Sequence, residues 1–236
     1  MSELCSLPAR LLRIARMASP CRVLADIGTD HAHLPVYMLQ QGLCSRAFAC
    51  DVNEGPLQRA RVAVAHWGMD DRIETVKSDG LKSVPEEYDT LVIAGMGGDL
   101  ISKILADHPP RCAEKIILQP MTKAEVLRNY LFTHGYRIRR EEASSEGDRH
   151  YIILDVIRGD HGQVDGFDCH LPQNLVPSRD ALDYLEKLLS SHQRRLLGLR
   201  RADSQEGEAI AFEEELCRRY RDLWTNISRR LHDETD

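Results

Sequence analysis

The sequence has no apolar run of about 18 residues, which is the length that a membrane-spanning helix requires. Residues 1–16 also lack the uninterrupted apolar segment that is typical of a secretory signal. With 236 residues, the chain is long enough for one α/β core and an appendage. These features predict a soluble, cytoplasmic protein that has no membrane partner.

Closely spaced cysteines are also absent. The seven cysteines are odd in number, scattered along the chain and never arranged as C-x-x-C. A disulfide framework needs pairs, and a zinc knuckle needs ligands at short spacing. The sequence therefore predicts reduced thiols and no metal site.

An excess of positive charge is the third absence. The formal net charge is −6, so no global positive field attracts nucleic acid, and RNA contact must come from local patches. Arginines gather at three places, where each group is equally consistent with a solvated face. The groups are Arg10, Arg13, Arg16 and Arg22; Arg137, Arg139 and Arg140; and Arg194, Arg195, Arg200 and Arg201.

Apolar strand-like runs alternate with helical patterns from residue 22 onward. We expect strands over 22–26, 47–51, 73–77, 90–94 and 115–119, and helices over 34–41, 56–67, 100–106 and 123–134. Such alternation is typical of a parallel sheet covered on both faces. Two further strands, 136–141 and 151–157, predict an antiparallel hairpin at the sheet edge. The expected fold class is α/β with a mostly parallel, seven-stranded, Rossmann-like sheet.

Both ends of the chain have helical periodicity. Apolar residues over 7–18 predict a cap helix with a basic outer face, and residues 159–177 lack periodicity and predict a connection. Two apolar seams then flank a polar break at 202–207 and predict an antiparallel coiled-coil hairpin. The seams are Leu182, Leu185, Leu189, His192, Leu196 and Leu199, and Phe212, Leu216, Tyr220, Leu223, Ile227 and Leu231. We expect one domain over 1–160, and a linker with the hairpin over 161–236.

The turn after the first strand is the most informative segment for function. A dinucleotide site requires G-x-G-x-x-G so that a pyrophosphate can approach the backbone. This turn has only Gly28, and its carboxylates Asp26 and Asp30 would repel a diphosphate. A cationic cofactor reverses that requirement, because carboxylates stabilise its charges at short range. The turn therefore favours S-adenosylmethionine, whose sulfonium and ammonium groups are both positive.

Acidic residues also follow the next two strands. Asp51 is placed to accept hydrogen bonds from ribose hydroxyls, and Asp79 to lie beside an adenine amino group. Each of Asp30, Asp51 and Asp79 has an alternative role as a helix N-cap. Three acidic strand ends in register nevertheless favour one shared cofactor site.

The fourth and fifth strands end in residues suited to an acceptor. Ala94 is followed by Gly95-Met96-Gly97-Gly98, which implies close backbone approach by a ligand or a tight turn. Gln119 either hydrogen-bonds the acceptor or caps a helix. His31 and His33 either contact a base or phosphate or are structural.

These blocks together resemble the bacterial TrmK family. The resemblance rests on residues 25–35, 51–57, 78–81, 93–98 and 117–120, and it departs at Met121, where many relatives have a polar residue. It implies a class I methyltransferase that uses S-adenosylmethionine to methylate N1 of adenine 22 in tRNA. The implied cofactor residues are Asp26, Gly28, Thr29, Asp30, His31, Asp51, Val52, Asp79, Gly80, Ala94 and Gly95. The implied catalytic or base-facing residues are Asp30, His31, Gly95, Met96, Gly97 and Gln119.

The resemblance also implies a tRNA partner, while the hairpin seam leaves a monomer or a weak dimer open. Adenine N1 is largely unprotonated at neutral pH, so positioning supplies most of the rate and no general base is required. Three alternatives are kept: a methyltransferase of another substrate, a silent RNA-binding relative and an NAD-dependent oxidoreductase. The glycine-poor acidic turn argues against the oxidoreductase, and the intact acidic strand ends argue against the silent relative.

Overall fold

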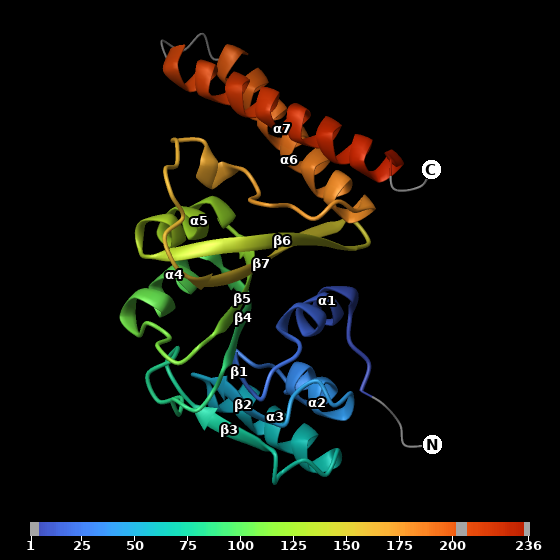
Figure 1. Cartoon of the computed structure of the whole chain (residues 1–236), viewed down its shortest axis with the longest axis vertical. Coiled ribbons are helices and arrows are strands. Elements are labelled where there is room, and N and C mark those ends of the chain that lie inside the picture. The colour runs from blue at the N-terminus through green and yellow to red at the C-terminus, as the bar shows by residue number, and fades with distance from the viewer. Residues whose placement is uncertain (1–4, 202–206, 234–236) are drawn as a thin grey trace.

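The computed structural model describes residues 5–201 and 207–233 (Figure 1). The strands are β1 (Val23–Ile27), β2 (Arg46–Asp51), β3 (Ile73–Lys77), β4 (Thr90–Gly97), β5 (Lys115–Thr122), β6 (Tyr136–Glu146) and β7 (Arg149–Arg158). The α-helices are α1 (Ala9–Ala18), α2 (His33–Gln40), α3 (Glu54–His66), α4 (Gly98–Asp107), α5 (Ala124–Thr133), α6 (Arg179–Arg201) and α7 (Gly207–Asp233). A short 3₁₀ helix, η1, spans Asp168–His170.

The strands form one seven-stranded sheet in the order β3-β2-β1-β4-β5-β7-β6. The first five strands are parallel, and β7 runs antiparallel to both β5 and β6. This confirms the predicted mostly parallel sheet with an antiparallel hairpin at its edge. The order reverses between β1 and β4, and such a switch point is where doubly wound sheets bind ligands.

The β6–β7 hairpin is longer than its sequence suggests. The prediction of a polar connection between residues 141 and 151 is wrong, because pairing continues from Glu142↔Ile153 to Glu146↔Arg149. Ala143 and Ser144 are each 1% exposed, so this polar-looking stretch is covered by other elements. The polar composition reflects contacts to neighbouring helices and not solvent.

Successive strand residues face two separate apolar layers. On β1, Leu24 belongs to a cluster that includes residues of α1, α2 and α3, whereas Ala25 belongs to a cluster with α4, α5, α6 and α7. This alternation follows from the pleat of a strand, which sends consecutive side chains to opposite faces. The sheet is thereby covered on both faces, and only its strand ends remain open to a ligand.

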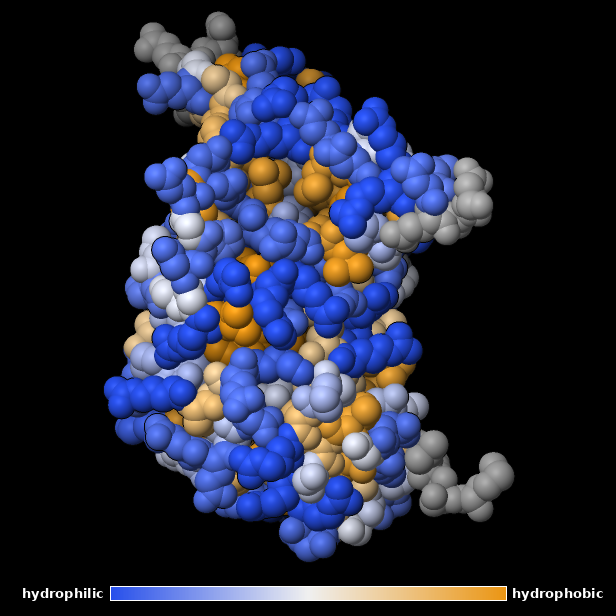
Figure 2. All heavy atoms as spheres, viewed as in Figure 1, coloured by the Kyte–Doolittle hydropathy of each residue, from blue (hydrophilic) through white to orange (hydrophobic). Residues whose placement is uncertain are grey.

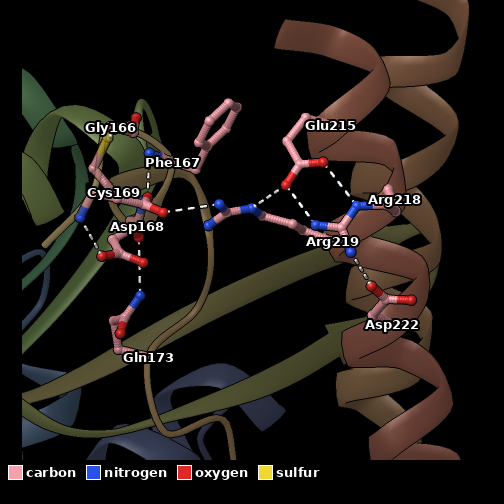
Figure 3. Close-up of polar contacts among 10 residues, drawn as sticks. Gly166, Phe167, Asp168, Cys169, Gln173, Glu215, Arg218, Arg219 and Asp222 are labelled. Carbon is pink, nitrogen blue, oxygen red and sulfur yellow. Dashed lines mark hydrogen bonds and ion pairs between the residues drawn. The ribbon is translucent and has the colours of Figure 1, made fainter. Parts of the chain in front are cut away.

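The segment between β7 and α6 is held in place by polar contacts (Figure 3). Asp165 binds the guanidinium of Arg219 on α7 at 2.8 Å, and the same guanidinium lies over the Phe167 ring at 4.5 Å. Gln173 donates to the Asp168 carbonyl oxygen at 2.9 Å. The predicted connection is therefore an ordered strap that joins the sheet domain to the hairpin.

Helices α6 and α7 pack against each other, which confirms the predicted hairpin. Figure 1 shows it at the end of the molecule opposite β3. Leu185, Leu216 and Tyr220 are buried where the hairpin meets the sheet domain, whereas Leu196 and Leu199 farther out are half-buried. The predicted polar break at 202–207 falls almost entirely on residues 202–206, which lie outside the described part of the chain.

Hydrophilic side chains cover most of the face shown in Figure 2, and its apolar patches are small and separate. Within the described residues, no helix combines the length and apolar character needed to cross a membrane. All seven cysteines are free, as their scattered spacing predicted.

Candidate active site

The turn after β1 is shaped by a glycine in the left-handed region. Gly28 has φ +79°, and its backbone N–H, like that of Thr29, donates to the Cys50 carbonyl oxygen at 2.8 Å. A Cβ atom at Gly28 would overlap the methyl group of Met96, which extends from the end of β4. The positive φ therefore favours glycine at this position, and the turn after β1 is in direct contact with the C-terminal part of β4.

The turn after β1 and the C-terminal part of β4 line a cavity of about 220 Å³ at the carboxyl ends of the strands. The cavity combines six of the predicted cofactor residues with four that the sequence did not assign to it. Its lining is Asp26, Gly28, Thr29, Asp30, Ala94 and Gly95 with Arg10, Leu11, His33 and Leu34.

Asp26 is the main charged group of this cavity. It is 7% exposed, and burial raises the pKa of its carboxyl group to about 6, against the opposing effects of the neighbouring Thr29 hydroxyl group and of the Arg10 charge. A carboxylate that has lost its water is stabilised by any cation that enters the cavity. Asp26 is thus suited to an ammonium group.

Two further features of the cavity indicate a ligand. The hydroxyl group of Thr29 is buried beside the Asp26 carboxyl group and makes no other polar contact among the described residues. Gly95 has φ +81°, and a Cβ atom there would meet nothing within 4 Å. A buried hydroxyl group with unused hydrogen-bonding capacity and an open backbone face are what a bound polar molecule would satisfy. The residues present therefore fit S-adenosylmethionine.

Gln119 does not point freely toward an acceptor. It is fully buried, and its carbonyl oxygen accepts from Arg10 Nη1 at 2.7 Å and from the Gly95 backbone N–H at 3.1 Å. Its amide nitrogen donates to the Pro120 carbonyl oxygen at 2.9 Å. With both ends of the amide occupied, Gln119 connects α1 to the β4 turn.

Asp30 and His31 lie at the rim of the cavity. Asp30 lines it, but its carboxylate also binds Arg59 Nη2 at 2.9 Å. His31, with φ +62°, lies 3.6 Å from the Asp30 carboxylate and stacks on His33 with ring centroids 5.3 Å apart. The His31 ring does not line the cofactor cavity and faces a neighbouring depression instead.

The remaining predicted cofactor residues follow β2 and β3 and lie outside the cavity lining. Asp51 accepts from the Asn53 backbone N–H at 2.7 Å, while Val52 and Asp79 are exposed. Gly80 has φ +57° and sits against Ile104. These residues share the carboxyl edge of the sheet with Asp26, as parallel strands require.

Met96 and Gly97 belong to β4 and not to the turn that the sequence suggested. Pairing with β5 continues through irregular register to Gly97↔Thr122. A Cβ atom at Gly98 would overlap the Lys123 backbone carbonyl, which explains the glycine that begins α4. The glycines here therefore allow close backbone packing as well as ligand approach.

Six of the eleven arginines in the three predicted groups are engaged in ion pairs. Arg10 lines the cofactor cavity, and Arg16, Arg137 and Arg194 are exposed without an ion pair to any described residue. The paired arginines are Arg13 with Glu142 and Asp180, Arg22 with Asp89, Arg139 and Arg140 with Asp155, Arg195 with Glu213, and Arg200 with Glu214. Arg201, at the end of α6, is also exposed.

A larger cavity of about 590 Å³ opens at the opposite edge of the sheet, among residues that begin β1, β4 and β5, such as Arg22, Thr90 and Lys115. Ligands of doubly wound sheets bind at the carboxyl edge instead. No three His, Cys, Asp or Glu side chains in the described ranges come together as a potential metal site.

Sequence reasoning assigned Arg10 to RNA binding and missed its place in the cofactor cavity. Arg10 is 109 positions from Gln119, and the guanidinium also lies over the Tyr151 ring at 5.4 Å. No local pattern links these positions. The only available signal was the basic outer face of the predicted N-terminal helix.

Comparison with known proteins identifies the family. Residues 7–154 match the family model described as a methyltransferase domain. The tRNA (adenine(22)-N(1))-methyltransferase of Bacillus subtilis (strain 168) is 35% identical over 163 residues, which are 68% of each chain. The chain belongs to the TrmK family.

Solved structures of TrmK proteins extend the match over nearly the whole chain. TrmK from M. capricolum, in complex with the cofactor product S-adenosylhomocysteine, has a TM-score of 0.78 at 25% identity and covers 94% of this chain and 99% of its own. The B. subtilis m1A22 tRNA methyltransferase TrmK has a TM-score of 0.72 at 26% identity, with the same coverage. The similarity therefore includes the C-terminal hairpin that distinguishes TrmK from a bare methyltransferase domain.

Proposed function

We propose that this protein transfers a methyl group from S-adenosylmethionine to N1 of adenine 22 in tRNA. The observation that carries the proposal is the buried Asp26 carboxyl group, which lies in a cavity lined by the turn after β1 and the C-terminal part of β4. A TrmK relative holds S-adenosylhomocysteine, and another is named for this reaction. When bound, the cofactor would supply the electrophilic methyl group.

The cofactor-binding role is divided among residues at the ends of four strands. Asp26 and the buried Thr29 hydroxyl group beside it would hold the charged amino-acid end, and the open face of Gly95 admits the ligand beside the backbone. Asp51 and Asp79 would accept hydrogen bonds from the ribose and the adenine amino group. The acidic set disfavours a diphosphate and so argues against an NAD-dependent enzyme.

The acceptor needs positioning more than acid–base chemistry. Adenine N1 carries its lone pair at neutral pH, so the protein has to hold the base in line and exclude water. Gln119 would act by fixing the Gly95 turn through its 3.1 Å bond to the backbone N–H. The methylated base is positively charged. The exposed Asp30 carboxylate would stabilise that charge once it leaves its ion pair with Arg59.

The tRNA has to present adenine 22 unpaired, which implies that the base leaves its stack. The exposed arginines Arg16, Arg137 and Arg194 would contact phosphates directly, whereas the ion-paired arginines first have to exchange their carboxylate partners. Phosphate contacts of this kind release counterions, so we expect tRNA affinity to fall steeply with salt. Affinity that is independent of salt would contradict the assignment of these arginines.

We place the activity in the cytoplasm, where its tRNA substrate is available, and propose a monomer or weakly associated dimer. The hairpin seam packs between α6 and α7 of the same chain, where its residues are buried or half-buried, so little of it is available for a strong coiled-coil dimer. The exposed large apolar residues of the hairpin, Leu197 and Trp224, are 51% and 38% exposed. Light scattering across a concentration series would test this, and a tight dimer at nanomolar concentration would contradict it.

The decisive experiment uses the labelled cofactor with two tRNA transcripts that differ only in adenine or guanine at position 22. We expect label in 1-methyladenosine at position 22 of the first transcript and none in the second. Label at another position would be consistent with methyl transfer to tRNA but would refute adenine 22 as the target. Absence of label in any RNA, together with binding of S-adenosylmethionine, would refute the proposed substrate class.

A further inference from the structure

A second depression lies beside the cofactor cavity, between the N-terminus of α2 and the outer face of α3. Its volume is about 440 Å³, and its wall includes His31, His33, Val62, His66 and Trp67. His33 lines both this depression and the cofactor cavity. The two sites are therefore continuous along the rim of the β1 loop.

The wall of this depression is built largely from flat rings. His31 and His33 are stacked at an interplanar angle of 13°, and His66 and Trp67 are nearly perpendicular, with centroids 5.0 Å apart. Val62 adds an aliphatic surface that is 62% exposed, which is unusual for a valine in the middle of a helix. A planar apolar ligand would cover these surfaces.

The rim of the depression carries positive charge close to the active site. Arg59 lines it, and its guanidinium is fixed by two hydrogen bonds to the same oxygen of Asp30, at 2.9 and 3.2 Å. Because Asp30 also lines the cofactor cavity, one ion pair stands between the two sites. A phosphate that replaces Asp30 on the Arg59 guanidinium would therefore lie between the two sites.

We propose that this depression binds one unpaired nucleobase of the same RNA, next to the base that enters the active site. The inference rests on the proposed function, since it needs an RNA substrate at the cofactor cavity. Proteins recognise unpaired bases by stacking them on aromatic rings and arginine planes, which this wall and rim supply. The cofactor is a poor occupant, because the buried Asp26 carboxyl group and the open face of Gly95 line the cofactor cavity and not this depression.

The first test places a negative charge in the depression without disturbing the core. Val62→Glu is compared with Val164→Glu, a matched control because Val164 is 41% exposed in the strap near α7. We expect Val62→Glu to raise the KM for unmodified tRNA at least about fivefold, the lower limit of one base–aromatic contact. The kcat and the affinity for S-adenosylmethionine should stay within about twofold of the control.

The outcomes separate this inference from the proposed function. If the wild-type protein methylates tRNA and the two glutamate variants share the same KM, the inference is wrong and the function stands. If the wild-type protein methylates no tRNA, both are wrong. If Val62→Glu loses affinity for S-adenosylmethionine by the same factor as it raises the KM for tRNA, the depression belongs to the cofactor site. That result would also overturn the inference.

A second test reads the stacking directly, because the chain contains two tryptophans, Trp67 and Trp224. Trp224→Phe leaves Trp67 as the single indole, and Trp67→Phe leaves Trp224 as the matched control. We expect unmodified tRNA to quench Trp67 emission with the same midpoint as tRNA binding, and to change Trp224 emission less. Unchanged Trp67 emission at saturating tRNA, or quenching by S-adenosylmethionine alone, would overturn the proposal.

Discussion

Asp26 meets two opposing demands at the residue scale. Its carboxyl group ends a fully buried strand, where desolvation disfavours the charged form, and yet a cationic cofactor requires that form. In the absence of the ligand, the desolvation of Asp26 destabilises the folded state. A cation that binds beside the carboxylate offsets this penalty. Arg10 offsets part of the penalty by placing a guanidinium near the same cavity.

Asp26→Asn should separate stability from cofactor binding. Burial raises the pKa of Asp26 to about 6, above its ordinary value, so the folded state binds this proton more tightly than the unfolded state. Stability of the ligand-free wild type should therefore fall as pH rises through about 6. At pH 8 the free energy of unfolding of Asp26→Asn should be up to about 3 kcal/mol higher than that of the wild type. This difference in stability should vanish below about pH 4.

The same variant should bind S-adenosylmethionine about 10- to 100-fold more weakly at pH 8, because it loses a charged hydrogen-bond acceptor. Wild-type affinity should decline as pH falls through about 6, and the variant's affinity should not follow that decline. Urea unfolding and calorimetric titration at both pH values measure these effects. Equal cofactor affinity of variant and wild type at pH 8 would refute the role of Asp26.

Arg10→Met should test the link from α1 to the active site. The substitution removes the 2.7 Å bond to Gln119 and a charge that holds the pKa of Asp26 down. We expect the acid limb of the kcat/KM profile to move to higher pH, and kcat to fall about tenfold as the Gly95 turn loosens. Arg16→Met, on the exposed face of the same helix, is the control for loss of an RNA contact, and we expect it to raise the KM for tRNA without moving the acid limb. A profile that matches the control would contradict this link.

At the scale of elements, a buried ion pair connects α5, β6 and the strap. Arg128 and Glu141 have side chains 2% and 0% exposed and form two bonds of 2.7 and 2.9 Å. Glu141 also accepts from the Gln173 backbone N–H at 2.6 Å, and Arg128 donates to the Cys169 carbonyl oxygen at 3.3 Å. The pair therefore fixes the strap, on which the hairpin is placed.

Breaking this pair from one side should cost more than replacing both partners. Glu141→Leu leaves the Arg128 charge buried and unpaired, and we expect the free energy of unfolding to fall by about 3–5 kcal/mol. The double variant Arg128→Met with Glu141→Leu should recover most of that loss, because it buries no charge. Urea denaturation of the two single variants and the double variant measures the coupling. A double variant less stable than Glu141→Leu would contradict this account.

At the scale of the whole molecule, the hairpin and the sheet domain share one core. Tyr184 and Leu185 of α6 and Leu216 and Tyr220 of α7 belong to the same apolar cluster as β1, β4 and β5 residues. Arg13 of α1 adds ion pairs to Glu142 on β6 and Asp180 on α6. The expected division at residue 160 therefore marks a change of architecture inside a continuous core.

This continuity predicts one cooperative unfolding transition. Calorimetry of the whole chain should give a single peak whose calorimetric and van't Hoff enthalpies agree, because removing the hairpin would expose the core. Two resolved transitions would show that the hairpin folds independently. Leu185→Ala and Leu91→Ala, which lie in the hairpin and the sheet, should each lower the same transition temperature, by several degrees.

The sequence by itself determined the elements with strong periodicity and the acidic strand ends. The alternation of strands and helices predicted the parallel sheet, and because parallel strands end at one edge, it also predicted Asp26, Asp51 and Asp79 at the same edge of the sheet. It predicted the two seams of the hairpin as well. These features are local, since each depends on the residue pattern within one strand, turn or helix.

Only the tertiary structure decided the features that join distant segments. The continuation of β6 through residues 142–146 depends on covering elements, and the burial of Glu213 at 1% exposure depends on His192 and Arg195 across the hairpin. The place of Arg10 in the cofactor cavity depends on how α1 packs. Charge and polarity are ambiguous in a sequence, because a polar side chain satisfied by a distant partner looks the same as one that faces water.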